Sequence, residues 1–77
     1  MENTVFETLK AEAEYAQGSY STELLYQTYG RATMARKLEA ISPEQFMELN
    51  EMTVVFMNTD KEYIRRKAAE FFGKEVE

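Results

Sequence analysis

The 77-residue sequence contains no cysteine and no histidine. Without cysteine the chain can form neither a disulfide nor a thiolate metal site. Without histidine it also lacks the commonest zinc ligand and the base of the Ser–His–Asp and Cys–His catalytic arrangements. We therefore expect no metal, no cofactor and no enzymatic activity.

Glycine and proline are scarce, with three Gly and one Pro, whereas apolar and aromatic residues make up 44% of the chain. This composition is typical of a compact domain rather than a disordered chain. No apolar run approaches the roughly 20 residues that a membrane helix needs. The first residues lack a basic region followed by an apolar stretch, so a signal peptide is not indicated. We expect one domain over residues 1–77, located in the cytoplasm and not in a membrane.

The formal net charge of −5 is unevenly distributed along the sequence. Residues 1–30 hold five Glu against Lys10 alone, whereas residues 61–77 hold five basic residues against four Glu. An acidic front and a basic rear are compatible with a dipolar surface or with head-to-tail self-association. Nucleic-acid binding by the whole surface is disfavoured, although a local basic patch remains compatible with this distribution.

Start and stop signals predict an all-α fold, a compact bundle of four short helices. Their expected ranges are 4–17, 22–40, 43–57 and 60–72. No linker or internal repeat separates them, and short loops between helices are typical of an antiparallel bundle.

The predicted helix ends rest on particular residues. Thr4 and Glu7 have the spacing of a capping box, and Gly18 is placed to end the first helix. Ser21 is the expected N-cap of the second helix. In the middle of that helix, Gly30 predicts a kink, a close helix crossing or a break.

The last two helices have equally clear signals. Ser42 and Gln45 form a capping box around a proline at the first helical position. The β-branched run at 53–55 leaves a strand open as an alternative to helix. Thr59 with Glu62 predicts a further capping box. The inner face expected for the last helix comprises Tyr63, Ile64, Ala68, Phe71 and Phe72.

The second helix carries apolar residues around most of its circumference. Such a helix is either central to the fold or contacts partners on two sides. Tyr and Arg side chains, which are enriched in interface hot spots, lie among them, although packing of the Tyr rings in the core is the alternative. The expected partner or dimer interface comprises Leu24, Tyr26, Tyr29, Arg31, Met34 and Leu38.

Two acidic groups invite a metal-site interpretation. The Glu residues of the first helix project from one face, whereas carboxylate metal sites need ligands converging from several helices. Residues 58–62 are too few for a calcium loop of the EF-hand type, which needs about twelve residues. Solvated charge and helix capping explain both groups.

A helix-turn-helix over 43–72 is the alternative functional interpretation. Lys61, Arg65 and Arg66 would then face nucleic acid. Glu62 and Glu70 flank these basic side chains and would repel phosphate groups. Intrahelical ion pairs therefore explain the same charge pattern without nucleic acid.

The segment from Tyr29 to Asn50, YGRATMARKLEAISPEQFMELN, resembles small uncharacterised helical accessory proteins of Gram-positive phages and conjugative elements. It contains no catalytic motif, so no functional residue is transferred. The resemblance implies a regulator, or an inhibitor of a host protein. Together with the apolar second helix, it predicts a small non-catalytic protein-binding module that forms a homodimer.

Overall fold

A computed structural model describes residues 3–73. Its elements are α1 (Thr4–Ser19), α2 (Thr22–Lys37), α3 (Pro43–Asn50), the π-helical segment η1 (Glu51–Val55), α4 (Phe56–Thr59) and α5 (Lys61–Phe72). Because α3, η1 and α4 follow one another without interruption, they form a single helical rod. The predicted all-α fold with four helices is confirmed.

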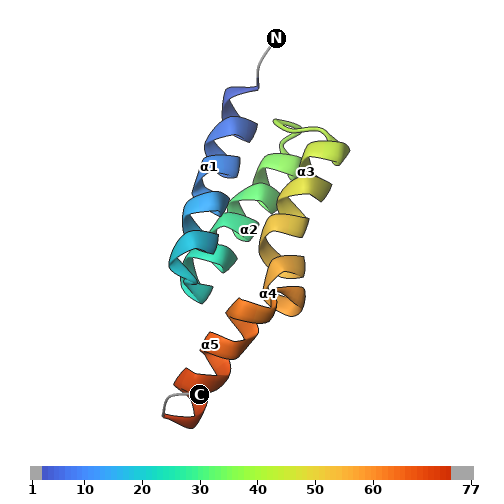
Figure 1. Ribbon diagram of the computed structural model, residues 1–77. Coiled ribbons are helices and arrows are strands. Elements are labelled where there is room, and N and C mark those ends of the chain that lie inside the picture. The colour runs from blue at the N-terminus through green and yellow to red at the C-terminus, as the bar shows by residue number, and fades with distance from the viewer. Residues whose placement is uncertain (1–2, 74–77) are drawn as a thin grey trace.

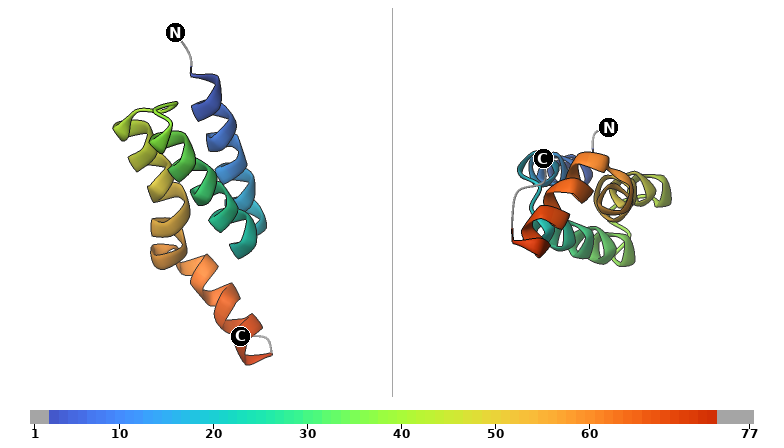
Figure 2. Two further views of the ribbon diagram at one scale, coloured as in Figure 1. Left: turned by 180° about the vertical axis from the view of Figure 1, so that it is seen from behind. Right: turned by 60° about the horizontal axis from the view of Figure 1, so that its bottom comes forward.

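The helices do not contribute equally to the packed part of the molecule. α1, α2 and the α3–α4 rod lie side by side, whereas α5 leads away from the lower end of the rod (Figures 1 and 2). The principal extents of 47 × 18 × 17 Å reflect this elongated outline. Only a single residue, Asp60, separates α4 from α5. Its extended conformation, with φ −76° and ψ 119°, redirects the chain without folding α5 back along the rod.

Two apolar clusters hold the helices together. The larger cluster joins α1, α2 and α3, and its buried members are Phe6, Leu9, Ala32, Ala35, Ile41 and Leu49. The smaller cluster joins Ala16 of α1 and Leu25 of α2 to Tyr63 of α5. The Tyr63 hydroxyl also shares a hydrogen bond with the Thr22 hydroxyl. Tyr63 therefore anchors the first turn of α5 to the lower end of the bundle.

Several helix ends match the sequence signals. The Ser21 hydroxyl accepts a hydrogen bond from the Leu24 amide at 3.2 Å and caps α2. At the start of α3, the Ser42 hydroxyl accepts from the Gln45 amide at 3.0 Å, and the Gln45 side chain accepts from the Ser42 amide at 2.9 Å. This reciprocal pair is the predicted capping box.

The ends of α1 and the start of α5 differ from prediction by one or two residues. Asn3 rather than Thr4 caps α1, because its side-chain oxygen accepts from the Phe6 amide. α1 continues through Gly18 and ends where Tyr20 adopts a left-handed conformation, with φ 53°. Asp60 rather than Thr59 caps α5 by accepting from the Tyr63 amide at 2.9 Å. Each of the two N-caps is thus an oxygen from the residue next to the predicted one. At the end of α1, Tyr20 adopts the left-handed conformation that was expected at Gly18.

α2 is shorter than predicted, and its glycine has a different role. It ends at Lys37 rather than residue 40, because Glu39 adopts a left-handed conformation with φ 60°. The Ala40 amide then donates back to the Ala35 carbonyl at 2.8 Å, which closes the helix end. Gly30 lies within the uninterrupted helix, and a methyl group added there would meet nothing within 4 Å. The expected break or close crossing at Gly30 is therefore wrong.

The β-branched run at 53–55 is helical and not a strand. Here the backbone widens into a π turn, in which the Phe56 amide donates to the carbonyl of Glu51, five residues earlier. Polar side chains satisfy carbonyls in this region: the buried Thr53 hydroxyl donates to Leu49 at 2.8 Å. The side-chain amide of Gln17 in α1 donates to the Met52 carbonyl at 2.9 Å. These bonds explain how a wider turn is tolerated against the packed α1.

Candidate interaction surface

Most of the predicted inner face of α5 is exposed. Tyr63 is only 5% exposed, but Ile64, Phe71 and Phe72 are 46%, 83% and 68% exposed. The helical period explains the difference: Ile64 is turned about 100° from Tyr63 around the axis. Beyond the first turns, moreover, α5 leads away from the other helices (Figure 1). The prediction that Ile64, Phe71 and Phe72 belong to a core face is wrong, because no helix within residues 3–73 covers them.

The exposed Ile64, Phe71 and Phe72 form one row along α5 with the half-buried Ala68, and we call these four residues the α5 stripe. Their spacing of i, i+4, i+7 and i+8 places them on the same side of a helix. The two phenylalanine rings meet edge to face, with centroids 5.2 Å apart. An amphipathic helix with anchors at this spacing is the usual ligand of a groove between two helices.

The basic residues predicted for nucleic-acid binding also lie on α5. Arg65 donates to both carboxylate oxygens of Glu62, at 2.7 and 3.3 Å, and Arg66 donates to the same carboxylate at 2.9 Å. These hydrogen bonds, led by that from Arg65, lower the pKa of Glu62 below its ordinary value. Lys61 is exposed at the start of the helix. One carboxylate therefore offsets charge on both arginines.

The six residues predicted for the partner interface do not form one surface. A residue that binds a partner must be exposed in the free chain. Tyr26, Met34 and Leu38 meet this condition, with side chains 59%, 54% and 72% exposed. Tyr29 is half-buried and its ring lies 6.1 Å from that of Phe46, so it faces α3. The buried line of α2 comprises Leu25, Thr28, Ala32 and Ala35.

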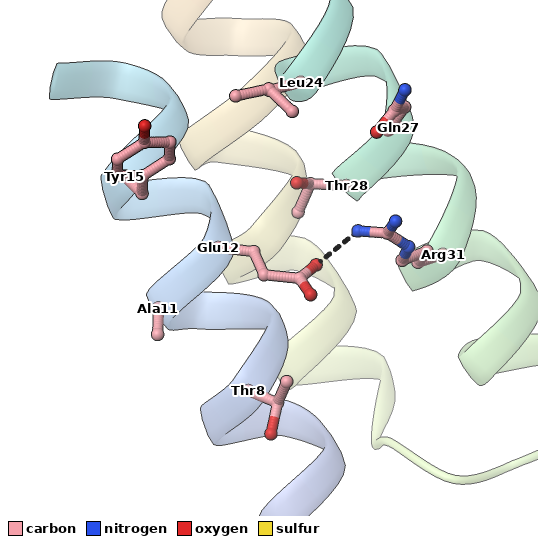
Figure 3. A pocket seen from close by; sticks show the side chains of 8 residues that line it. All are labelled: Thr8, Ala11, Glu12, Tyr15, Leu24, Gln27, Thr28 and Arg31. Atoms are coloured by element: carbon pink, nitrogen blue, oxygen red, sulfur yellow. Dashed lines mark hydrogen bonds and ion pairs between the residues drawn. The ribbon is translucent and has the colours of Figure 1, made fainter. Parts of the chain in front are cut away.

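Leu24 and Arg31, the two remaining members of that set, line a groove between α1 and α2 with a volume of about 540 Å³ (Figure 3). The full lining consists of Thr8, Ala11, Glu12, Tyr15, Leu24, Gln27, Thr28 and Arg31. Glu12 and Arg31 form an ion pair of 2.8 Å across the groove. We call this feature the α1–α2 groove.

The α1 wall of the groove was not predicted from the sequence. Thr8, Ala11 and Tyr15 follow the helical spacing of three and four residues, which could have marked a second face on α1. The alternation of these residues with Glu12 and Glu14 instead suggested a solvated face. Only the position of α2 beside α1 turns the row into one wall of a groove.

Within residues 3–73, no group of three or more Asp or Glu side chains is arranged to hold a metal ion. In the same part of the chain, no helix is both long and apolar enough to cross a membrane.

Comparisons with protein-family models, curated proteins and solved structures found no match to this chain. The resemblance over residues 29–50 to accessory proteins of mobile elements therefore stays a prediction, and the functional argument depends on the surfaces of the molecule itself.

Proposed function

We propose that this chain is a small non-catalytic protein-binding module that acts as a homodimer in a regulatory or accessory role. The observation that carries the proposal is the α5 stripe. Phe71 and Phe72 stand on a helix that leads away from the bundle, where they remain largely exposed. Burying one such side chain is worth roughly 1.5–3 kcal/mol, so a partner that covers both rings gains substantial binding energy.

The size of the chain supports the same proposal. A domain of this length has a small core, and oligomerisation is a common supplement to its stability. Here the packed part of the molecule contains three helices side by side, while α5 joins it mainly through Tyr63. Additional exposed apolar residues on α2 and at its C-cap, such as Tyr26 and Leu38, offer further area for contact.

The charge pairing and direction of α5 support DNA binding less than they support protein binding. Glu62 accepts hydrogen bonds from both Arg65 and Arg66, which reduces the positive charge available to phosphate groups. α5 also continues away from α3 rather than crossing it, whereas the helices of a helix-turn-helix cross one another. Protein binding is the function that these observations favour.

Light scattering on the purified full chain over a dilution series tests the proposal. We expect a mass of two chains at high concentration, falling toward one chain on dilution. A mass of one chain at every concentration would contradict the homodimer. Duplex DNA added at low salt provides the comparison, and association abolished by Arg65→Ala with Arg66→Ala would favour the DNA-binding alternative instead.

A further inference from the structure

We infer that the α5 stripe of one copy docks in the α1–α2 groove of a second copy, and that the exchange is reciprocal. This inference rests on the proposed homodimer and specifies its two surfaces. Ile64, Phe71 and Phe72 would be the anchors, and the walls formed by Thr8, Tyr15 and their neighbours on α2 would receive them.

The charges beside the α5 stripe argue against pairing of two identical stripes. Arg65 and Lys67 border the stripe on its two sides, and Lys61 continues it toward the start of the helix. Glu62 pairs with Arg65 and Arg66, and Glu70 pairs with Lys67, but the four cations of α5 outnumber its two carboxylates, so the helix keeps a net positive charge. Two α5 helices placed stripe to stripe would bring these cations together, which costs binding energy. The surface that receives α5 should therefore be acidic.

The α1–α2 groove is acidic on both rims. Glu7 and Glu14 lie four and three residues from Ala11, so they border the α1 wall on the same side of the helix. Glu23 lies four residues before Gln27 and borders the α2 wall in the same way. Arg31 is the one cation in the lining within residues 3–73, and it is paired with Glu12. The groove thus complements the basic borders of the α5 stripe.

The dimensions of the two surfaces also agree. From Ile64 to Phe71 the stripe spans seven residues, which is two helical turns or about 10 Å. The α1 wall runs from Thr8 to Tyr15, again two turns. A volume of about 540 Å³ lies within the range of pockets that receive compact apolar ligands.

The α5 stripe cannot reach the groove of its own chain. Tyr63 fixes the first turn of α5 against Leu25 and Ala16 at the lower end of the bundle. From there α5 leads away from α1 and α2, with Phe71 and Phe72 at its far end (Figure 1). A second copy is therefore required, and one stripe and one groove per chain allow a closed two-fold dimer.

Three variants, each measured by light scattering and sedimentation, test the inference. Phe71→Ala with Phe72→Ala removes the anchors, and because both rings are exposed the variant should fold normally. Thr8→Trp fills the groove from an exposed position on α1. Met47→Ala is the matched control, since Met47 is 54% exposed but lies on α3, outside both surfaces. Circular dichroism verifies that every variant retains its helices.

We expect the first two variants to dimerise about a hundredfold or more weakly than the unmodified chain, while Met47→Ala dimerises normally. Mixing the double Phe variant with Thr8→Trp at high concentration should then give a one-to-one complex held by one of the two contacts, because the intact stripe of one variant meets the intact groove of the other. If the dimer instead formed by pairing of two α5 stripes, these two variants could not form a complex, because the double Phe variant lacks the anchors of its stripe.

The outcomes separate the two proposals. If the unmodified chain is monomeric throughout, the homodimer itself is contradicted. If the chain is dimeric but the double Phe variant dimerises as well as Met47→Ala, or the mixture of variants stays monomeric, only the docking of α5 in the groove is overturned. In that case Tyr26→Ser, on another side of α2, should weaken a dimer formed through α2 alone.

Discussion

The guanidinium carbon of Arg66 lies 4.4 Å from the centre of the Tyr20 ring. This contact connects α5 to the turn between α1 and α2, two segments separated by most of the sequence. Tyr20 has a left-handed backbone, with φ 53°, which bulky side chains rarely adopt. The strained turn thus presents an aromatic face to α5 and, together with Tyr63, determines how α5 leaves the bundle.

Arg66→Ala should lower the free energy of unfolding by about 0.5–1 kcal/mol, the usual contribution of an exposed cation–π contact. A double-mutant cycle with Tyr20→Leu, followed by urea denaturation, isolates the contribution of the ring. Additive effects of the two substitutions would mean that the ring and the guanidinium do not stabilise each other.

Two substitutions that exchange glycine and non-glycine residues should both stabilise the chain. Gly30→Ala places a methyl group in open space within a helix, and should raise the free energy of unfolding by about 1 kcal/mol. Glu39→Gly relieves a left-handed backbone at φ 60°, and should add about 1 kcal/mol. Gly18→Ala is the matched control for Gly30→Ala, because Gly18 is also helical and a methyl group added there would meet nothing within 4 Å. Thermal unfolding measures all three, and a lower midpoint for Gly30→Ala would contradict the open helix face.

Asn3 has two roles that substitution can separate. Its oxygen caps α1, while its amide nitrogen donates to the Ala40 carbonyl at 2.7 Å and to the Gln45 side chain at 3.3 Å. Asn3→Asp keeps the cap but cannot donate, so we expect an intermediate loss of stability. Asn3→Ala loses both roles and should cost about 1–2 kcal/mol. Equal stability of the two variants would show that the cap on α1 contributes nothing, and an Asn3→Asp variant as stable as the unmodified chain would show the same of the bonds to Ala40 and Gln45.

The π turn depends on two hydrogen bonds that can be removed one at a time. Thr53→Val keeps the buried shape but removes the donor to the Leu49 carbonyl. Gln17→Leu removes the donor to the Met52 carbonyl. Each should lower the free energy of unfolding by about 1 kcal/mol, and amide hydrogen exchange should be faster at residues 51–55. Unchanged exchange in the Gln17 variant would show that α1 does not stabilise this turn.

Acidification should loosen α5 through Glu62. Hydrogen bonds from Arg65 and then Arg66 hold the pKa of Glu62 below its ordinary value of 4.5. Because this pKa is lower in the folded state, the ion pairs stabilise the helix above the ordinary value and are lost as the pH falls through the lowered one. A carbon-13 NMR titration should find the midpoint of Glu62 below 4.5, and Arg65→Gln with Arg66→Gln should raise it.

Local patterns in the sequence were sufficient for the all-α class, the four helices and several of their caps. Ser42 with Gln45 is the clearest case, because a capping box involves residues only three positions apart. The buried line of α1 also follows the helical period, since Phe6, Leu9, Ala13 and Ala16 lie three or four residues apart.

The direction of α5 was decided only by the tertiary structure, whereas the pairing of its charges is local, because Glu62 lies three and four residues before Arg65 and Arg66. The apolar period of Ile64 and Phe71 indicates a helix face, but whether that face is covered depends on where the neighbouring helices lie. The groove arises for the same reason, because Thr8 and Arg31 belong to different helices and meet only when α1 and α2 pack together. Local preferences act over a few residues, whereas exposure is a property of the whole arrangement.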